Sequence, residues 1–500
     1  MERSPAVLHA SRRLRILLVK PKPRLGPIVA LHRFQLLEPI ELGYLAAAVP
    51  PGHDVRVLDL RFAHFPLISF RAALRRYRPD IVGITGYTHE ANIVKALARE
   101  VHRCTPAASV IVGGHHATVA AMDYDIPEID AVVRGEGCGP FRRIVEALAH
   151  GETIRGLEDV LTPGAINPSD LEAFPAFPDP ATMPSPRRDL WSSASYYSVW
   201  AAEGAAMFQR LFVPASMVRT SFGCRMKCTF CIVPKLFHGR HLARPAEAVA
   251  EEISRLPHDH VYFCDDENFV DDVFANELAG ELEKLGVKKR YFAWTRSTTV
   301  NRFPDLFKRW RALGLDAAFI GFEFPTDEQL RKVRKGATVA ENAKAHTALR
   351  SMGIAVHAAF MLRPEFDEAD FDRLRTYVRE MPPAQFSFTI CTPSPGTEDY
   401  EDILPRIWTP AAFDLHDCMH PLTPTRLPLR RFCKLYAEQV REAGAKNPRR
   451  ADKRPIHPVD APRLIRAQFS YGRAFENVYR DYPRELWDAA GGQSGPIGIA

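Results

Sequence analysis

Thr220-Ser-Phe-Gly-Cys224-Arg-Met-Lys-Cys228-Thr-Phe-Cys231 is the most informative stretch of the chain. Its three cysteines have the spacing C-x₃-C-x₂-C, which places them on one tight loop. Three close thiolates form a soft, anionic pocket that suits an iron–sulfur cluster or a zinc ion. A cubane cluster usually takes four cysteines, so three leave one iron open for a substrate or a cofactor. The spacing therefore favours a [4Fe–4S] cluster with an open iron over zinc.

Zinc and simple burial are the alternatives for this loop. A Cys₃His zinc site would use His238 as its fourth ligand. Three buried free cysteines would behave as small hydrophobes, but Arg225 and Lys227 make the loop polar. A disulfide is disfavoured because three is an odd number and nothing in the sequence indicates secretion.

At these residues the chain resembles the radical SAM enzymes. Cys224, Cys228 and Cys231, with Phe230 directly before the third, match the signature of that family. The resemblance implies that the three thiolates hold a [4Fe–4S] cluster whose open iron binds S-adenosylmethionine (SAM), and that Phe230 packs near the adenine. One electron then cleaves SAM to a 5′-deoxyadenosyl radical. An electron donor such as flavodoxin or ferredoxin is therefore implied as a partner.

Length and composition are those of an ordinary globular protein of two or three domains. Of 500 residues, 46% are hydrophobic and 25% are charged, and the net charge is +6. This charge suits an anionic substrate or a membrane surface but is too diffuse to indicate nucleic acid. Nine cysteines with one tight cluster indicate a reducing compartment. We see no signal peptide and no apolar run that would span a membrane, so we expect a cytoplasmic protein.

Residues 14–150 alternate between apolar strands and helices, which predicts a doubly wound parallel sheet in an α/β domain. The expected strands are 15–20, 55–60, 80–85, 109–114 and 131–134. The expected helices are 40–49, 70–77, 89–102 and 141–150. Such sheets bind ligands in the crevice at the carboxyl ends of their strands. Residues 1–13 are expected to be a loose arm.

Glycine-containing motifs follow three of these strands: Thr85-Gly-Tyr-Thr88, Gly113-Gly-His-His-Ala-Thr118 and Arg134-Gly-Glu-Gly137. Glycine lets the backbone approach a large flat ligand, although tight turns alone would also explain each motif. As a set, the motifs resemble the cobalamin-binding domain of many radical SAM proteins. That resemblance implies cobalamin contacts from Thr85, Gly86, Gly113, Gly114, His115, Gly135, Glu136 and Gly137.

One feature of classical cobalamin domains is missing. They carry Asp-x-His-x-x-Gly, whose histidine binds cobalt from below, and residues 14–150 have no such motif. His115 and His116 lie in a predicted turn, where a histidine is more often only a polar turn residue. The lower ligand of cobalt is therefore unassigned.

A second α/β domain is predicted over residues 216–395, after a proline-rich linker over residues 151–215. The expected strands are 216–219, 260–264, 290–295, 317–322, 354–361 and 385–391. The expected helices are 245–255, 273–285, 304–313, 341–352 and 368–380. Six β/α units predict a partial parallel (β/α)₆ barrel of the radical SAM type, with its chemistry at the carboxyl ends of the strands.

Polar side chains follow three further strands of this barrel. Radical SAM enzymes usually carry a Gly-Gly-Glu motif that grips the amine of SAM, and here Cys264-Asp-Asp266 takes its place. The resemblance therefore implies an amine contact from Asp265 or Asp266, with a helix N-cap as the alternative. Arg296 and Glu323 are candidate contacts for the ribose or carboxylate of SAM, with a surface salt bridge as the alternative. We assign no catalytic residue.

Residues 396–500 are expected to form a helical C-terminal region. It follows a rigid turn at Thr392-Pro-Ser-Pro-Gly-Thr397, and helices are expected at 429–443 and 462–487. The basic run Lys446-Asn-Pro-Arg-Arg-Ala-Asp-Lys-Arg454 is typical of a solvated segment. The more specific interpretation is that this run is attracted to membrane lipids and gives peripheral membrane contact.

Within this class the chain looks most like the hopanoid C-3 methylases, over about residues 14 to 440. The matching features are Leu37-Glu-Pro39, Gly113-Gly-His115, Arg134-Gly-Glu-Gly137, Phe237-x-Gly239-Arg240, Thr392-Pro-x-Pro-Gly-Thr397 and Pro424-Thr-Arg-Leu-Pro428. The resemblance implies methyl transfer to an unactivated carbon, with a hopanoid-type lipid as substrate. One SAM would methylate reduced cobalamin, and a second would give the radical that abstracts hydrogen from the substrate.

Three other functions stay open. One is a cobalamin-dependent radical SAM enzyme that does not methylate, such as a tetrapyrrole cyclase or oxidase. Another is a methylase of a peptide or natural product. The third, outside the enzymes, is a zinc- or cobalamin-binding regulatory protein. The third alternative is distinguished by colour, because anaerobically reconstituted protein with a [4Fe–4S] cluster absorbs broadly in the visible range and a zinc protein does not.

Overall fold

The structure is a computed structural model that describes residues 12–200, 202, 210–408, 412–445 and 457–488. These residues form two compact units. The described residues of Met1–Arg24, Pro39–Pro178 and Thr182–Trp191 form the first unit, and those of Leu25–Glu38, Asp179–Ala181 and Ser192–Ala500 form the second, which we call the barrel unit. The basic run 446–454 and nearly all of the expected N-terminal arm lie outside the described residues.

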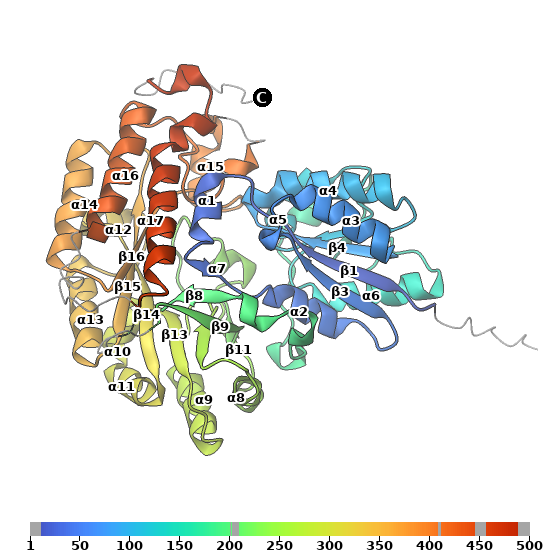
Figure 1. Cartoon of the computed structure of the whole chain (residues 1–500), viewed down its shortest axis with the longest axis horizontal. Coiled ribbons are helices and arrows are strands. Elements are labelled where there is room, and N and C mark those ends of the chain that lie inside the picture. The colour runs from blue at the N-terminus through green and yellow to red at the C-terminus, as the bar shows by residue number, and fades with distance from the viewer. Residues whose placement is uncertain (1–11, 201, 203–209, 409–411, 446–456, 489–500) are drawn as a thin grey trace, which may run out of the picture. The chain divides into compact units, whose positions relative to one another are not determined.

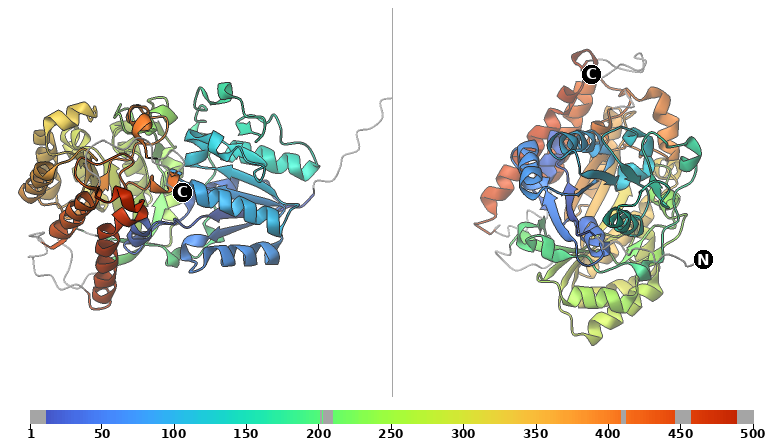
Figure 2. Two further views of the ribbon diagram at one scale, coloured as in Figure 1. Left: turned by 90° about the horizontal axis from the view of Figure 1, so that it is seen from above. Right: turned by 90° about the vertical axis from the view of Figure 1, so that its right-hand side faces the viewer.

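The first unit is built on a six-stranded sheet in the order β3-β1-β4-β5-β6-β7. Its strands are β1 (Arg15–Lys20), β3 (Asp54–Asp59), β4 (Ile81–Thr85), β5 (Ser109–Gly113), β6 (Ala131–Val133) and β7 (Val160–Leu161). Its longer helices are α2 (Ile40–Ala48), α3 (Pro66–Tyr77), α4 (Ala91–Cys104) and α6 (Cys138–His150), and a short helix, α5 (His115–Val119), follows β5. The first five strands are parallel, and helices cover both faces of the sheet (Figures 1 and 2). The predicted doubly wound parallel sheet is confirmed.

Burial explains why these strands read as continuous apolar runs. Ile16, Leu18, Ile81 and Ile111 form one core with side chains of α2 and α6 such as Phe141. Parallel strands covered on both faces have no solvent-facing side that would require polar residues. The predicted strands therefore lie within one residue of the observed ones.

Part of the expected linker belongs to the first unit. Residues 151–178 lie in this unit, and they contribute β7, which pairs antiparallel with β6. The prolines of this segment predicted irregular backbone correctly over most of its length, but a two-residue strand carries no periodic signal.

The barrel unit contains an eight-stranded sheet in the order β16-β15-β14-β13-β12-β9-β8-β2. Six neighbouring strands are parallel: β9 (Phe212–Val218), β12 (His260–Phe263), β13 (Arg290–Thr295), β14 (Leu315–Glu323), β15 (Ala355–Leu362) and β16 (Gln385–Ile390). The helices expected between them are α8 (Ala246–Ser254), α9 (Asp272–Lys284), α11 (Pro304–Leu313), α13 (Val339–Ser351) and α14 (Glu368–Glu380). The partial (β/α)₆ barrel is confirmed, and Figure 1 shows its helices outside the strands.

Two antiparallel strands extend this sheet beyond the prediction. β8 (Tyr197–Val199) pairs with β9, and β2 (Gln35–Leu36) pairs with β8. β2 follows the short helix α1 (Gly26–Leu31), so an N-terminal segment is built into the barrel unit. The structure also adds two short helices between predicted strands, α10 (Ser297–Arg302) and α12 (Asp327–Lys332).

The C-terminal region is helical, as predicted. α16 (Leu429–Ala445) matches the first expected helix. The second expectation is too long, because α17 (Ala461–Glu476) ends well before residue 487 and short 3₁₀ turns follow it. Across the part of the chain that the structure describes, no helix combines the length and the apolar character that crossing a bilayer requires.

Candidate functional site

The three cysteines lie on the loop between the short strand β10 (Ser221–Phe222) and the short helix α7 (Val233–Leu236). Gly223 opens this loop with φ of +84°, and a Cβ there would lie 2.3 Å from the carbonyl oxygen of Arg240. Only glycine fits this position. The helix predicted at residues 245–255 is α8, which begins at residue 246.

The cysteine side chains suit an iron–sulfur cluster. All three are free thiols, and none is more than partly exposed. Burial, with the Glu267 carboxylate as the next cause, raises the pKa of Cys224 to about 12. Burial also raises the pKa of Cys231 to about 12, and the other two cysteines of the loop add to that rise. Three thiols on one loop, none of them more than partly exposed, form the all-sulfur donor set that clusters take.

The zinc alternative gains no geometric support. His238 is exposed and has φ of +51°. Within the described residues, no three His, Cys, Asp or Glu side chains are arranged as ligands around a single metal ion. A cubane differs from such a site because each thiolate binds a different iron atom, so its sulfurs need not converge on one point.

Asp265, a candidate for the SAM amine, is buried and fastens the cysteine loop to the barrel. Its carboxylate accepts hydrogen bonds from the backbone N–H of Thr220 (2.7 Å), the hydroxyl of Thr220, the hydroxyl of Ser221 (3.1 Å) and the amide of Asn268. Burial raises the pKa of this carboxyl even though these donors lower it. The oxygens of Asp265 therefore already accept hydrogen bonds from within the protein.

Asp266 is also engaged. It forms an ion pair with Arg219 (2.6 Å) and accepts the N–H of Gly223 at 2.8 Å. It therefore holds the entry to the cysteine loop. The helix N-cap considered as the alternative for this acidic stretch is found at Asp271, whose Oδ1 accepts the N–H of Phe274 at 3.1 Å.

Glu267 is the acidic side chain that faces the cysteines. It is 1% exposed, and its Oε2 lies 3.5 Å from the Sγ of Cys224. Its other oxygen accepts the hydroxyl hydrogen of Thr299 in α10. Sequence reasoning selected the preceding Asp265 and Asp266 but not Glu267, because the spacing of the cysteines gives no information on which carboxylate faces them.

Arg296 and Glu323 lie at the ends of β13 and β14, as predicted, and Lys335 connects them. The Glu323 carboxylate pairs with the Lys335 ammonium at 2.7 Å, and both groups are buried. The Arg296 guanidinium donates to the carbonyl oxygen of Lys335. The surface salt bridge considered for them is wrong, because both side chains are buried. Lys335 had no signal in the sequence, since it lies in a loop after α12.

Phe230 belongs to the cysteine loop, and the proline-rich turn 392–397 contacts the same part of the chain. Phe230 is partly buried and packs on the core of the barrel unit. The carbonyl oxygen of its neighbour Thr229 accepts the N–H of Asp399, which follows the turn, at 3.3 Å. Lys235 in α7 donates to the carbonyl oxygen of Gly396 within the turn. The segment 392–397 therefore braces the cysteine loop rather than only leading away from the barrel.

The loops after β4 and β5 meet at the carboxyl edge of the first unit's sheet. Gly114 has φ of +95°, and a Cβ there would lie 2.5 Å from the hydroxyl of Thr85 and 3.1 Å from the backbone nitrogen of Gly86. The N–H of His116 donates to the carbonyl oxygen of Gly86 at 3.1 Å. The predicted residues Thr85, Gly86, Gly113 and Gly114 are thus brought together, and packing between the loops itself requires glycine at position 114.

The loop after β6 joins them. Thr118 accepts the N–H of Gly135 at 3.0 Å and donates to the carbonyl oxygen of Gly114 at 2.9 Å. Gly135 has φ of +71°, and the Glu136 carboxylate accepts the N–H of Cys138 at 2.9 Å. A Cβ on Gly137 would lie 3.1 Å from Leu45. Beside this loop is a pocket of about 520 Å³ whose lining includes the buried Arg134 and Pro175.

The two histidines of the β5 loop differ. His116 is fully buried, and its Nε2 lies 3.2 Å from a carboxylate oxygen of Asp123. His115 is half-buried beside the ring of Tyr87. Burial lowers the pKa of His115 to about 4, with His116 and His89 adding to the effect. His115 is therefore neutral at physiological pH.

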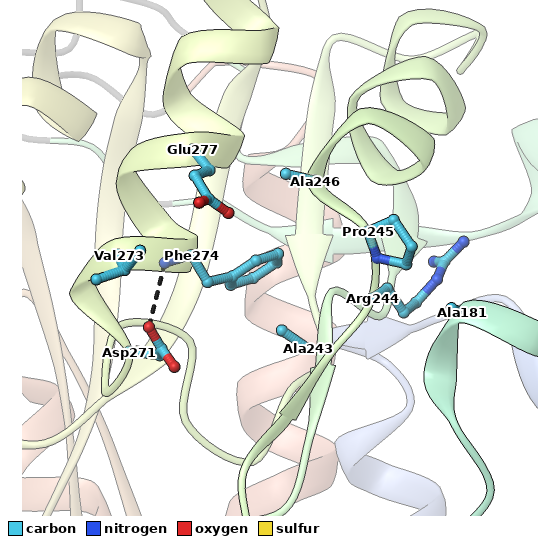
Figure 3. Close-up of a pocket in the computed structure, with 9 residues that line it drawn as sticks. All are labelled: Ala181, Ala243, Arg244, Pro245, Ala246, Asp271, Val273, Phe274 and Glu277. Atoms are coloured by element: carbon cyan, nitrogen blue, oxygen red, sulfur yellow. Dashed lines mark hydrogen bonds between the residues drawn. The ribbon is translucent and has the colours of Figure 1, made fainter.

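A further pocket, of about 480 Å³, lies on the barrel unit and is shown in Figure 3. Its lining includes Ala243 and Arg244 on one side and Phe274 and Glu277 of α9 on the other. None of the described residues that line it is a site residue predicted from the sequence. We therefore do not assign it to the cluster or to SAM.

Comparison with known proteins agrees with this geometry. Residues 26–145 match the model of the B12 binding domain, and residues 218–378 match that of the radical SAM superfamily. The chain is 28% identical over 421 residues to the hopanoid C-3 methylase of Methylococcus capsulatus, covering 83% of this chain and 78% of the relative. It is 25% identical over 385 residues to the anaerobic magnesium-protoporphyrin IX monomethyl ester cyclase of Rubrivivax gelatinosus, covering 73% of this chain and 66% of the relative.

A solved structure shares the fold. The radical SAM methyltransferase TsrM of Kitasatospora setae, solved with cobalamin and a [4Fe–4S] cluster bound, has a TM-score of 0.56 and 19% identity. The match covers 78% of each chain. At 19% identity this similarity shows a shared fold and nothing more.

The protein is a radical SAM enzyme with an N-terminal cobalamin-binding domain. More particularly, it is similar to radical SAM methyltransferases, among them the hopanoid C-3 methylase of M. capsulatus. Its cofactors are a [4Fe–4S] cluster, SAM and cobalamin.

Proposed function

We propose that the enzyme is a methyltransferase that places a methyl group on an unactivated carbon of a hopanoid-type lipid. The observation that carries the proposal is the similarity to hopanoid C-3 methylase, which extends over 83% of the chain and so includes both domains and the cysteine loop. The cofactors supply a radical that can break an unactivated C–H bond and a methyl group that can replace the hydrogen.

The chain's own residues then have distinct tasks. Cys224, Cys228 and Cys231 bind three irons and leave the fourth for SAM. Glu267 receives the ammonium group of SAM in place of the family's Gly-Gly-Glu motif. The loops after β4, β5 and β6, which carry the predicted cobalamin contacts, bind cobalamin in the crevice where such sheets take ligands.

The same proposal includes the cellular setting. A [4Fe–4S] cluster and nine cysteines, three of them in one tight loop, suit a reducing compartment, which favours the cytoplasm. Cleavage of SAM consumes one electron, so the chain needs a small electron-transfer protein of the flavodoxin or ferredoxin kind.

A non-methylating cyclase or oxidase is the second candidate, and the similarity to the R. gelatinosus cyclase favours it. Turnover with methyl-labelled SAM distinguishes the two. Methyl transfer places label in the product and yields both S-adenosylhomocysteine and 5′-deoxyadenosine. Product formed with 5′-deoxyadenosine alone, without label or S-adenosylhomocysteine, would replace the methylase with the cyclase or oxidase.

Cobalamin binding is expected to depend on the close packing at Gly114. Gly114→Ala should weaken binding of hydroxocobalamin by the full chain about tenfold or more, because overpacking of this size costs about 1–3 kcal/mol and would displace the loops. Equilibrium dialysis measures the change.

Gly52→Ala is the matched control. Gly52 has φ of +98°, nearly that of Gly114, but a Cβ there meets no atom within 4 Å. It therefore carries the backbone strain without the crowding, and it should bind cobalamin as the wild type does. Equal losses in both variants would show that general destabilisation, not the loop contact, is responsible.

We also expect the EPR spectrum of the cob(II)alamin form to lack nitrogen splitting from a protein histidine.

The face of α17 fits a membrane surface, where a lipid substrate would be found. Leu464, Ala467 and Phe475 are buried beneath the helix, whereas Ile465 and Phe469 are 66% and 70% exposed. The exposed Arg466 and Arg473 lie on the same outer face. Large apolar side chains between arginines suit the interface of an anionic bilayer.

The double variant Ile465→Ser with Phe469→Ser is expected to bind vesicles containing phosphatidylglycerol at least about tenfold more weakly. Each large apolar side chain that leaves water contributes about 1.5–3 kcal/mol. Co-sedimentation measures the binding. Val273→Ser, which changes a 63% exposed valine on α9, is the control and should bind normally. Wild-type protein that stays in the supernatant would refute membrane contact.

A further inference from the structure

Arg296 is a buried cation beside the cysteine loop. It follows β13 and precedes α10, and it is 8% exposed. Its Nη1 lies 3.9 Å from the Sγ of Cys228. Its Nε is buried without a hydrogen-bond partner among the described residues.

The surroundings hold Arg296 without neutralising it. Its Nη2 donates to the backbone carbonyl oxygen of Lys335, which is a neutral acceptor. The nearby carboxylate of Glu323 is already paired with the ammonium of Lys335 at 2.7 Å. Within the described residues Arg296 has no ion pair with a carboxylate. A buried guanidinium in this state needs another anion nearby, because an uncompensated buried charge is costly.

The thiolate of Cys228 and the cluster that it binds can be that anion. Reduction of the cluster by one electron from an external donor adds a negative charge to the cluster and its sulfurs. A cation and an N–H donor beside one sulfur stabilise this reduced form more than the oxidised form. We propose that Arg296 is a positioning residue that raises the reduction potential of the cluster through its contact with Cys228. The inference rests on the proposed cluster site and adds to it the control of the electron-transfer step.

Potentiometry on the reconstituted full chain, without SAM, tests this inference. In Arg296→Gln the ratio of reduced to oxidised cluster at a fixed potential should fall about tenfold, a shift of 59 mV for one electron. Arg296→Lys keeps the charge and should shift the ratio less. Iron and sulfide content must stay at the wild-type value. Wild-type protein without a cluster would overturn the proposed function itself, whereas an intact cluster with an unchanged potential would overturn only the role of Arg296.

Arg225→Gln is the matched control. Arg225 directly follows Cys224 in sequence, but its side chain is 53% exposed, so water and salt screen its charge. Its loss should change the ratio less than threefold. If both variants shift the ratio equally, the effect comes from net charge, and the specific contact of Arg296 is refuted.

A measurement on the wild type covers the case in which Arg296→Gln fails to fold. Protein made with ¹⁵N-arginine and reduced with dithionite should show a weak ¹⁵N coupling to the cluster spin in pulsed EPR. Arg225→Gln protein should keep this coupling. A reduced cluster without any ¹⁵N-arginine coupling would place Arg296 too far from Cys228 and would overturn the inference.

Discussion

Replacing any one of Cys224, Cys228 and Cys231 with alanine is expected to abolish detectable SAM cleavage and to remove most of the bound iron. Each cysteine binds a different iron of the cluster, so a missing thiolate leaves a second iron without a protein ligand. Anaerobic reconstitution followed by iron and sulfide analysis measures the first effect, and 5′-deoxyadenosine formation measures the second.

Cys104→Ala is the control for this series. Cys104 is a partly buried free cysteine at the end of α4 in the first unit, away from the cysteine loop in sequence. It should keep the wild-type iron content. Wild-type protein that carries stoichiometric zinc after anaerobic purification, with no visible cluster absorbance, would favour the Cys₃His alternative.

The sequence predicted the parallel strands well because their burial leaves a strong local signal. The strand predicted at 290–295 coincides with β13, where Tyr291 and Ala293 are fully buried. Long-range pairing leaves no such signal. β2 has two residues and lies in the barrel unit, where it pairs with β8, about 160 residues later in the chain. Nothing in the local sequence of β2 indicates that partner.

The acidic stretch after β12 shows the same limit within the site. The resemblance to radical SAM enzymes implied that Asp265 or Asp266 would contact SAM, because these residues take the place of the family's Gly-Gly-Glu motif after this strand. Residues distant in sequence give them different partners: Thr220 and Ser221 donate hydrogen bonds to Asp265, and Arg219 forms an ion pair with Asp266. These partners lie in the segment that connects β9 to the cysteine loop, so the fold, and not the motif, leaves Glu267 as the carboxylate that faces the cysteines.

Glu267→Gln is expected to weaken SAM binding by about 10- to 100-fold while leaving the iron content unchanged. The Cys224 Sγ lies 3.5 Å from one Glu267 oxygen, to which a Cys224 thiol can donate. A Cys224 thiolate bound to iron cannot donate, so that oxygen would be left buried beside a second negative charge. The ammonium group of SAM would supply both the charge and the donor that are then missing. Hydrogen bonds to charged groups are worth about 1.5–3 kcal/mol, which corresponds to this range of affinity.

Equilibrium dialysis with SAM on the reconstituted protein measures the effect, with Asp271→Asn as the matched control. Asp271 lies four residues further on, and asparagine can replace aspartate as the N-cap of α9. Asp271→Asn should therefore bind SAM normally. If Glu267→Gln binds SAM as tightly as the wild type and Asp266→Asn with a full cluster does not, the ammonium contact belongs to Asp266. The hydroxyl of Thr299 donates to the other Glu267 oxygen. Thr299→Val should therefore weaken SAM binding less than Glu267→Gln does, because it removes one hydrogen bond to the carboxylate but leaves its charge.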